Sequence, residues 1–256
     1  MKLLSWNVNG IRAVHKKGML LPLIEREKPD ILCLQETKAE KSQLPPEITE
    51  LPGYFSFFES SKIKKGYSGT AIYSKIPPEK IETGFGEKRF DEEGRIQTAE
   101  FKKFTMLNIY FPNGKQGPVR LAYKMDFYKK FLKVCEKKRK AGRELVICGD
   151  VNTAHKDIDL ARPGPNRGVS GFLPEETEFL DMFIGRGYID TFREFEKEGG
   201  HYTWWDVISR ARERDVGWRI DYFYITPGLR KKLKGAFILK NVMGSDHCPV
   251  GIIMDV

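Results

Sequence analysis

The sequence predicts an α/β fold in which β-sheets and helices form layers around one hydrophobic core. Three observations support this prediction. Apolar runs of strand length recur along the 256 residues, helical patterns separate some of these runs, and no stretch has the composition of a linker between domains. Two sheets packed face to face would account for so many strands. We therefore expect a single domain over residues 1–256.

The strand-like segments are spread over the whole chain. They are KLLSWNV (2–8), ILCLQET (31–37), TAIYSK (70–75), IQTAEF (96–101), TMLNIYF (105–111), LVICGDV (145–151), DYFYIT (221–226), GAFILK (235–240) and VGIIMDV (250–256). Helices are predicted at residues 19–28, 118–140 and 174–186. Lys28-Pro29 supplies the stop of the first helix, and Pro174 followed by two glutamates makes a good first turn for the third.

The charge of the chain indicates the kind of partner. The formal net charge of +9 favours a polyanion such as nucleic acid, and a basic surface that binds nothing is the alternative. The predicted helix at 118–140 runs into EKKRKAGR, residues 136–143. This run is either a nucleic-acid patch or a solvated helix end, where cations are favoured by the helix dipole.

The cysteines and the apolar runs indicate a compartment. Four cysteines lie far apart, and two of them sit inside apolar runs, where a thiol behaves as a small hydrophobe; they are Cys33, Cys135, Cys148 and Cys248. The N-terminus lacks the pattern of a secretory signal, and no apolar run approaches the roughly 20 residues that span a bilayer. We expect a reduced, cytoplasmic protein without membrane association.

Polar side chains collect where three of the predicted strands end. Asn7 and Asn9 follow LLSW, Glu36 follows ILCLQ, and Asp150 and Asn152 follow LVICG. Residues two apart in an extended strand point to the same face, so each pair is expected to face one cleft. The alternative is that Asp and Asn simply begin turns there. Three coincident strand ends, at the edge where α/β proteins bind ligands, favour a shared site.

The segment GSDHCPV, residues 244–250, places Asp246 beside His247 just before an apolar run. Adjacent residues in extended backbone point to opposite faces, so Asp246 is badly placed to orient the His247 ring. Asp221 is the better candidate, because a carboxylate inside the aromatic run DYFYI costs several kcal/mol unless it is paired. A working histidine usually has one ring nitrogen oriented by an acid. For His247 alone, a structural histidine is the alternative.

Oxygen ligands without a Cys/His cluster indicate the kind of metal. Carboxylate and carboxamide groups suit a hard cation that keeps its waters, so Mg²⁺ is expected rather than zinc, and Mn²⁺ is expected to substitute for it. Such an ion can bridge a phosphate oxygen and offset charge on the leaving oxygen. A carboxylate such as Asp150 would take a proton from the attacking water.

Six motifs, in order and spacing, resemble one family. They are WNVNGIRA, LQETK, YFPNG, GDVNTAH, GWRIDYF and GSDHCP. Together they are similar to the exonuclease III class of apurinic/apyrimidinic (AP) endonucleases, within the endonuclease/exonuclease/phosphatase superfamily, over essentially the whole chain. The SDH core suits any superfamily member, whereas GWRIDYF and YTWW are far narrower. The resemblance implies a four-layer α/β sandwich, with two facing mixed sheets flanked by helices as in deoxyribonuclease I, and an active site at their common rim.

The resemblance also implies which residues bind the metal ion and which act on the attacking water. Glu36 resembles the main metal ligand of the family, with Asn9 and Asp246 nearby. Asp150 resembles the residue that activates the attacking water. Asn152 resembles the residue that positions this water or a phosphate oxygen.

A second group of residues resembles the phosphate contacts of the family. Tyr110 and Asn7 match groups that hold the scissile phosphate. His247, oriented by Asp221, matches the residue that donates a hydrogen bond to a phosphate oxygen. Its role would be electrostatic, as the pentavalent state gathers negative charge.

Substrate recognition is implied for loops and tryptophans. Trp204 and Trp218, with Ile220, match positions that line a small apolar pocket for a flipped-out abasic sugar. Two core tryptophans are the alternative, and Trp205 is expected in the core. Residues expected to contact the DNA without reading its sequence are Arg12, Lys65, Gly66, Tyr67, Asn113, Lys115, Gln116, Arg120, Arg210, Arg212 and Arg214.

The sequence departs from the family pattern at several positions. Asn9 stands where some members have Asp, which implies a weaker second metal site. Gln116 stands where the human enzyme has an arginine beside the lesion, and residues 206–208, DVI, replace the usual Ser-Tyr-Arg, so lesion preference is expected to differ. The NGK loop and the segment ARPGPN…VSGFLPEE are similar to an archaeal member that also nicks at deoxyuridine, a reaction that Lys115 could serve.

The expected function is hydrolysis of the phosphodiester 5′ to an abasic site in duplex DNA, which leaves a 3′-hydroxyl. A 3′→5′ exonuclease or 3′-end-cleaning activity is expected beside it, with nicking at deoxyuridine as a further reaction. The expected partners are Mg²⁺ and duplex DNA with abasic or damaged sites, with no obligatory protein partner. The alternatives are a less selective nuclease or small-molecule phosphatase of the same superfamily, and a DNA-binding module with a degenerate site.

Overall fold

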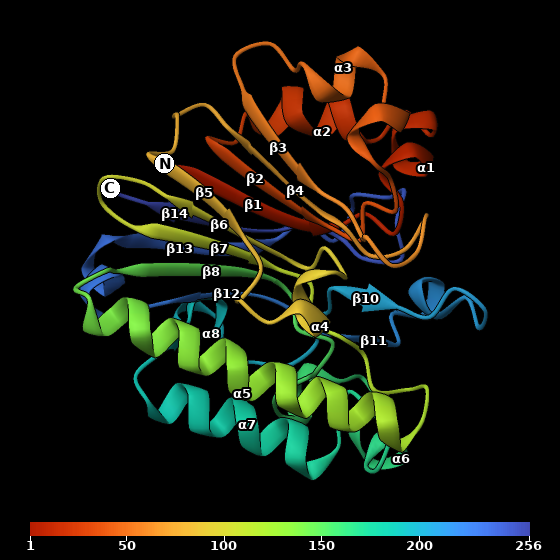
Figure 1. Ribbon diagram of the computed structural model, residues 1–256. Coiled ribbons are helices and arrows are strands. Elements are labelled where there is room, and N and C mark those ends of the chain that lie inside the picture. Colours follow the sequence, from red (N-terminus) through yellow and green to blue (C-terminus); the bar gives the residue numbers. More distant parts are fainter.

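Two sheets face each other at the centre of the molecule, and helices cover their outer faces (Figure 1). The computed structural model describes residues 1–256. The strands of the first sheet are β1 (Lys2–Asn7), β2 (Ile31–Gln35), β3 (Phe55–Glu59), β4 (Thr70–Ser74), β13 (Leu233–Ile238) and β14 (Val250–Met254). Their order is β13-β14-β1-β2-β4-β3. Pairing is antiparallel except between β1 and β2, which run parallel.

The second sheet has the same number of strands and the same mixed character. Its strands are β5 (Lys80–Thr83), β6 (Ile96–Glu100), β7 (Thr105–Ile109), β8 (Leu145–Asp150), β9 (Ile189–Asp190) and β12 (Asp221–Ile225). Their order is β5-β6-β7-β8-β12-β9, and only β7 and β8 are parallel. A separate short hairpin pairs β10 (Trp204–Trp205) with β11 (Gly217–Trp218).

The helices form the two outer layers. The α-helices are α1 (Ile11–Lys16), α2 (Leu20–Glu27), α3 (Pro46–Thr49), α4 (Lys88–Asp91), α5 (Pro118–Lys140), α6 (Pro163–Asn166), α7 (Pro174–Gly185) and α8 (Thr191–Phe195). Short 3₁₀ turns are η1 (Lys41–Gln43), η2 (Asp157–Asp159), η3 (Ala211–Arg214) and η4 (Pro227–Lys232). Figure 1 shows α1, α2 and α3 over the first sheet, and α5 and α7 over the outer face of the second.

Three apolar layers hold these four layers together, because both faces of each central strand are buried. On β1, Leu3 packs between the two sheets and Leu4 packs toward α2. On β8, Val146 packs between the sheets and Ile147 packs toward α5. Burial of each such side chain contributes about 1.5–3 kcal/mol. Two buried faces also explain why these strands read as continuous apolar runs rather than as alternating ones.

The predicted four-layer α/β sandwich is confirmed, and each predicted strand segment and helix is present. The helix predicted at 118–140 has the same bounds in the structure. The first predicted helix ends where Lys28 adopts a left-handed conformation, with φ 47°, before Pro29. The sequence did not reveal β3, β5 and β9, which are three of the four edge strands of the sheets; β3 and β5 carry only exposed or half-buried residues, and β9 has two residues.

The structure also describes the cysteines, which were predicted to be reduced, and the helices, none of which was predicted to span a membrane. All four cysteines are buried free thiols. Burial raises the pKa of Cys135 well above its usual value, so this thiol is poorly reactive. None of the helices combines the length and the apolar composition that a membrane span requires.

Candidate active site

The ends of β1, β2 and β8 meet at one rim of the two sheets. The parallel pairing of β1 with β2 brings Asn7 next to the residue before Glu36. The Asn7 amide nitrogen Nδ2 donates to Glu36 Oε2 at 3.1 Å and to Asp150 Oδ2 at 2.9 Å, and so it connects the two sheets. Asn7 and Asp150 are buried, whereas Glu36 is half-buried and faces the rim.

The side chains converge through tight turns rather than through strand alternation. Our expectation that Asn9 and Asn152 continue extended strands is wrong, because both adopt left-handed backbone with φ 44° and 55°. At each strand end an Asx turn forms: the Asn9 N–H donates to Asn7 Oδ1 at 2.9 Å, and the Asn152 N–H donates to Asp150 Oδ1 at 2.8 Å. Glu36 also has a positive φ of 57°. All three turns fold polar side chains back over the rim.

A glycine permits the approach of β8 to β7 beside the catalytic candidate Asp150. Gly149 has φ 140°, and a Cβ atom there would lie 1.8 Å from the carbonyl oxygen of Ile109. Any other residue would therefore push the two strands apart. The Phe111 N–H donates to the Asp150 carbonyl at 2.9 Å, which fixes the backbone just beyond this contact.

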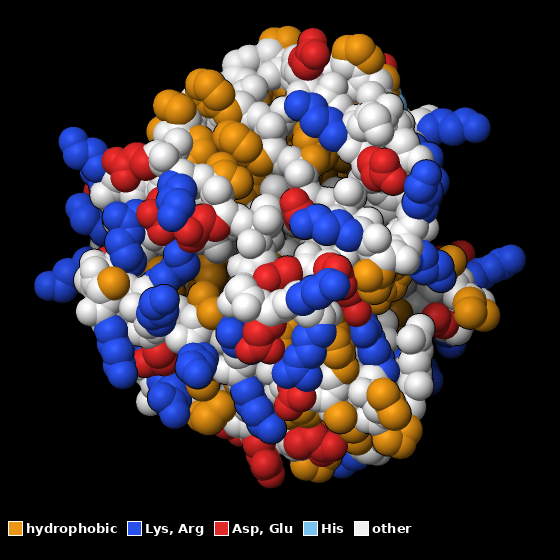
Figure 2. Space-filling model, in the orientation of Figure 1, with side chains coloured by type: hydrophobic (Ala, Val, Ile, Leu, Met, Phe, Trp, Pro, Cys, Tyr) orange, Lys and Arg blue, Asp and Glu red, His pale blue; other side chains and the backbone are white.

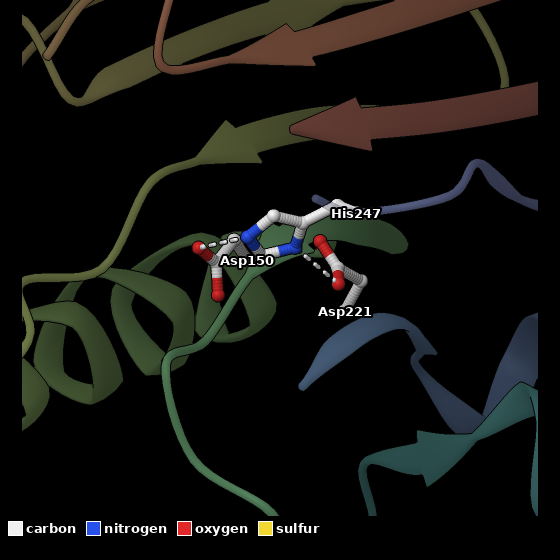
Figure 3. Close-up of side chains that lie close together, drawn as sticks. All are labelled: Asp150, Asp221 and His247. Carbon is white, nitrogen blue, oxygen red and sulfur yellow. Dashed lines mark hydrogen bonds and ion pairs between the residues drawn. The ribbon is translucent and has the colours of Figure 1, made fainter. Parts of the chain in front are cut away.

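His247 lies between two buried aspartates (Figure 3). Asp221 and Asp150 are direct neighbours on the antiparallel strands β12 and β8. His247 Nδ1 lies 2.8 Å from Asp221 Oδ2, and His247 Nε2 lies 3.9 Å from Asp150 Oδ2. Asp221 Oδ2 also accepts a hydrogen bond from the Thr203 hydroxyl at 2.6 Å. The ring is thus oriented by Asp221 and not by its sequence neighbour Asp246, as the sequence indicated.

The two acids change the protonation of the site. Burial alone would lower the pKa of His247, but the negative charges of Asp221 and Asp150 raise it to about 10. Burial raises the pKa of Asp150 to about 7, although the charge of His247 acts in the opposite direction. At neutral pH the ring is therefore an imidazolium, and Asp150 exchanges its proton near neutrality. A charged His247 can donate a hydrogen bond to an anion, and an Asp150 that ionises near neutrality can act as a general base.

The rim surrounds a pocket of about 290 Å³. Its lining residues come from segments far apart in the chain: Asn9, Glu36, Lys38, Tyr110, Asn113, Lys115, Asp150, Asn152, Ser170, Gly171, Trp204, Trp218, Ile220, Asp246 and His247. Asn7 and Asp221 lie directly behind this wall and contact Asp150 and His247. The structure therefore brings together all the predicted catalytic, metal-binding and sugar-pocket residues.

One wall of the pocket is aromatic. The rings of Trp204 and Trp218 meet edge to face, with centroids 6.2 Å apart. Both pack against a small apolar cluster that includes Ile220 and Phe172. The indole Nε1 of Trp204 donates to Asp246 Oδ2 at 3.0 Å, so this wall is attached to the polar side of the pocket. By contrast Trp205 is buried in the core, as expected.

Besides His247 and Asp150, the pocket contains a group of oxygen donors from Glu36, Asn9 and Asp246. Asp246 Oδ1 accepts from Asn9 Nδ2 at 2.8 Å. The Lys38 ammonium lies 2.9 Å from Glu36 Oε1 and donates to Asn9 Oδ1. The oxygens of Glu36 and Asn9 thus already converge on a positive charge. Hard oxygen donors that converge on one point fit a divalent cation such as Mg²⁺.

A different acidic group, Asp150 with Asp221 and His247, has its ligand atoms within 4.8 Å of one another and can also hold a metal ion by geometry. In this group, however, Asp221 Oδ2 already accepts from His247 and Thr203. Asp150 likewise accepts from Asn7 and Asn152. A charged His247 between the two acids also repels a cation. The oxygens of Glu36 and Asn9 are engaged as well, but their partner Lys38 is a cation that a metal ion can replace, so the group around Glu36 is the candidate metal site.

The sequence profile of the Endonuclease/Exonuclease/phosphatase family matches residues 4–247. The chain belongs to this family. It is similar to the exodeoxyribonuclease of Bacillus subtilis, with 40% identity over the full length of both chains. It is also similar to the DNA repair nuclease APEX1 of Danio rerio, with 42% identity over the whole of this chain and 83% of the relative. Among solved structures it resembles an AP endonuclease from Archaeoglobus fulgidus, with a TM-score of 0.90, 28% identity and full coverage of both chains.

Arg120 and Tyr67, which were predicted to contact DNA, belong to an internal hydrogen-bond network. The Arg120 guanidinium donates to Glu93 Oε1 at 2.8 Å and to the Tyr67 hydroxyl at 2.8 Å. Arg95 pairs with the same Glu93 and lies over the Tyr110 ring, 4.5 Å from its centroid. The network thus positions Tyr110 at the pocket. A direct contact of Arg120 or Tyr67 with DNA stays a prediction.

The other predicted DNA contacts differ in how they are placed. Arg12, Lys65, Gly66, Gln116, Arg210 and Arg214 are exposed, and Asn113 and Lys115 line the pocket. The Lys115 ammonium lies 4.9 Å from the centre of the Trp204 ring. The Arg212 guanidinium donates to the carbonyls of Ser245, Lys240 and Val242, and its direct contact with DNA stays a prediction. Arg212 therefore holds the segment before His247, which gives it a structural role that the sequence did not indicate.

A buried ion pair behind the pocket was also missed. Lys124 and Glu176 are fully buried, and Lys124 Nζ lies 2.7 Å from Glu176 Oε1. Lys124 donates to the Asn152 carbonyl at 2.8 Å, and Glu176 Oε2 accepts from the Gly171 N–H at 2.5 Å. The pair thus joins two loops that line the pocket. Lys38 was also missed, although it stands inside the quoted motif LQETK.

Proposed function

We propose that this protein is an AP endonuclease of DNA repair, which hydrolyses the phosphodiester 5′ to an abasic site in duplex DNA and leaves a 3′-hydroxyl. One observation carries the proposal. A single pocket has the His247–Asp150 pair and the Glu36 group on its polar side and Trp204 and Trp218 on its apolar side. The polar side suits phosphate chemistry, and the apolar side suits a sugar without a base.

Asp150 is proposed as the base that takes a proton from the attacking water. Its carboxylate has acceptor capacity for about four hydrogen bonds, and it already accepts three, from Asn7 Nδ2, Asn152 Nδ2 and the Asn152 N–H. One position is therefore left for a water molecule. The Asn152 amide nitrogen is used by Asp150 and the Phe111 carbonyl, so its Oδ1 is the atom that would orient this water.

His247 and Tyr110 are proposed as the donors that hold the phosphate. The Nε2–H of the charged His247 ring faces the pocket, while Nδ1 is held by Asp221. Burial raises the pKa of Tyr110 well above its usual value, so its phenol stays protonated and donates. Charge develops on the phosphate oxygens in the pentavalent state, and fixed donors in a pocket of this kind are worth about 2.7–4 kcal/mol each.

Mg²⁺ is the proposed cofactor, held by Glu36 with Asn9 and Asp246 nearby. The bound ion would offset the negative charge on the phosphate and the leaving oxygen. Lys38 lies on the oxygens of this group and would have to move aside when the ion enters. Its side chain is 34% exposed, so it can turn toward solvent. Mn²⁺ has similar ligand preferences and is expected to substitute.

Duplex DNA with an abasic or damaged site is the proposed substrate. A nucleotide without a base costs least to extrude from the stack, because it forms no base pair. The same phosphate chemistry at a 3′ end gives the 3′→5′ exonuclease or end-cleaning activity that we propose as a second reaction. Nicking at deoxyuridine is a further proposal, supported by Lys115 at the mouth of the pocket beside Trp204.

A panel of labelled duplexes tests these proposals in one assay. The duplexes carry an abasic site, a uracil, a 3′-phosphate or no damage, and each is incubated with Mg²⁺ or with EDTA. We expect cutting 5′ to the abasic site with Mg²⁺ and none with EDTA. If the duplex without damage is cut as fast as the abasic one, the protein is a less selective nuclease. If no duplex is cut, it is a DNA-binding module without catalysis.

The double variant Trp204→Ala/Trp218→Ala separates the lesion pocket from the chemistry. Loss of two apolar walls is expected to reduce kcat/KM at abasic sites by roughly 100-fold, since burial of one such side chain is worth about 1.5–3 kcal/mol. Degradation of undamaged 3′ ends should change by less than threefold. The control is Phe195→Ala, an aromatic side chain 51% exposed outside the pocket. An equal loss on both substrates would contradict a lesion pocket.

A further inference from the structure

The C-terminal half of α5 forms a strongly basic groove with the edge of the second sheet. The groove has a volume of about 1080 Å³ and lies between α5 and the strands β5 and β6. Its basic lining residues, here called the basic groove, are Lys129, Lys130, Lys133, Lys137, Lys138, Lys140, Arg143 and Arg186, and its acidic ones are only Glu82, Glu100 and Glu136. Figure 2 shows Lys and Arg side chains gathered on the left of the molecule, where Figure 1 places this end of α5.

Internal ion pairs account for only part of this charge. Lys130 pairs with Glu87 at 2.8 Å, and Lys138 lies 3.2 Å from both Glu82 and Glu100. These lysines have a structural explanation. Lys133, Lys137, Lys140 and Arg186 line the groove without any acidic partner within 4 Å.

The helix dipole explains the unpaired lysines only in part. Lys133, Lys137 and Lys140 are spaced i, i+4 and i+7, so they form one stripe along α5. The stabilising effect of the dipole is confined to the last turn, which contains Lys137 and Lys140, and Lys133 lies before it. Like charges four residues apart on a helix repel each other. The stripe therefore costs the free protein stability, and an anion bound in the groove would remove this cost.

The basic groove is separate from the active site. Asn113 and Lys115 line the catalytic pocket just before α5 begins at Pro118. With a rise of 1.5 Å per residue, Lys133 lies about 22 Å further along the helix axis. Duplex DNA is stiff, with a persistence length of about 150 base pairs, so a duplex seated at the catalytic rim would not turn back into the groove. A duplex that crosses the rim without running along α5 therefore leaves the groove free for a separate molecule or a distant part of the same one.

We propose that the basic groove binds the phosphate backbone of a second segment of duplex DNA while the catalytic pocket holds the first. A stripe of unpaired lysines suits a polyanion with repeated charges, and contacts of this kind do not depend on base sequence. On long DNA the protein would touch two segments at once and pass from one to the other without full release. This inference extends the proposed function, because it adds a DNA-binding site that takes no part in cutting.

Binding stoichiometry tests the second site. A short undamaged duplex is titrated into the protein in EDTA at about 50 mM salt, a salt level at which phosphate contacts are strong, and the complexes are resolved by analytical ultracentrifugation. We expect the unmodified protein to bind two duplexes. The variant Lys133→Glu/Lys137→Glu/Lys140→Glu should bind one, and Lys133→Gln/Lys137→Gln/Lys140→Gln should bind the second at least tenfold more weakly.

A charge-matched control separates the basic groove from the net charge of the protein. Lys231, Lys232 and Lys234 are exposed and lie on η4 and β13, so they change the net charge equally when replaced by Glu. This control should still bind two duplexes, and abasic-site cutting on a short duplex should stay within twofold in all variants. One duplex on the unmodified protein, or equal loss in the control, overturns the proposal. Because binding is measured in EDTA, a failure of the proposed cutting activity would appear separately.

Discussion

His247 and Asp221 share a buried hydrogen bond, with Nδ1 of the ring 2.8 Å from Oδ2 of the carboxylate. The bond joins the segment after β13 to the first residue of β12, and it leaves His247 Nε2 to face the pocket. The Trp6 indole donates to the His247 carbonyl at 3.1 Å and fixes the backbone of the same residue. The ring is therefore held in one orientation before any substrate binds, which lowers the cost of organising the site in the transition state.

Asp221→Asn is expected to reduce kcat at abasic sites by roughly 100-fold, because one positioned and charged donor is weakened. Asp221 and Asp150 together raise the pKa of His247 to about 10. Without the charge of Asp221, His247 loses its proton at a lower pH, so the alkaline limb of the rate profile should move toward neutrality. The rate profile and the ring-proton titration of His247 by NMR measure this shift.

Asp181→Asn is the control, since Asp181 holds a histidine outside the pocket, with Oδ1 2.9 Å from His155 Nε2. This change should leave kcat and the alkaline limb in place. An unchanged alkaline limb in Asp221→Asn would mean that His247 does not act as a charged donor.

Asp150→Asn is expected to reduce kcat by 10²–10⁴-fold, the range of a general base, while affinity for abasic DNA stays within about threefold. Burial raises the pKa of Asp150 to about 7, so in the unmodified enzyme the rate should rise as the pH increases toward 7 and the carboxyl ionises. A bound cation nearby would shift this rise to lower pH. Single-turnover rates between pH 5 and 9 measure it, and a variant with normal turnover would show that Asp150 is not the base.

Much of this arrangement was predictable from the sequence, because its signals are local. The apolar runs of β1, β2 and β8 predicted buried strands, and the polar residues at their ends predicted one rim. The pairing of His247 with Asp221 followed from the cost of a carboxylate in an apolar strand. The resemblance supplied the aromatic pocket, since nothing in the spacing of Trp204 and Trp218 distinguishes a pocket wall from a core.

What the sequence did not reveal depends on contacts between distant residues. The left-handed turns at Asn9 and Asn152 are local Asx turns, but their side chains then bond to Asp246 and to the Phe111 carbonyl, so strand alternation predicted the wrong local geometry for the right residues. Arg120 reads as a free cation in the sequence, but Glu93 lies 27 positions away and pairs with it. Lys124 lies within a helix that is otherwise rich in exposed lysines, and only its burial against Glu176 distinguishes it.

Glu36→Gln is expected to raise the Mg²⁺ concentration needed for half-maximal activity by at least tenfold, since it removes a charged oxygen ligand. Direct Mn²⁺ binding, followed by electron paramagnetic resonance without DNA, should weaken in parallel and does not depend on activity. Glu25→Gln, an exposed carboxylate on α2, is the control and should change neither measurement. If both metal titrations of Glu36→Gln match the unmodified protein, Glu36 is not the ligand.

Glu93→Gln should reveal how much the network behind Tyr110 stabilises the fold. Burial alone would raise the pKa of Glu93, but Arg120 and Arg95 lower it to about 2, below its usual 4.5. A depressed carboxyl pKa stabilises the folded state above pH 4.5, and this contribution is lost as the pH falls toward 2. Allowing for solvent screening near Arg120, we expect Glu93→Gln to lower the free energy of unfolding by about 2 kcal/mol at pH 7 and by much less at pH 3.

Urea unfolding at pH 7, 5 and 3 measures this difference for Glu93→Gln. The control is Glu92→Gln, because the neighbouring carboxylate makes only a loose surface pair with Lys88 at 3.7 Å and should matter by less than about 0.5 kcal/mol at any pH. The two arginines that Glu93 neutralises are left unpaired in the variant, so Tyr110 should also lose its fixed position and kcat should fall at neutral pH. A destabilisation of the same size at pH 7 and pH 3 would instead mean that Glu93 acts through packing, because the electrostatic contribution falls over that interval, as the Glu93 carboxyl of the unfolded chain takes up its proton near pH 4.5, whereas a packing contribution does not.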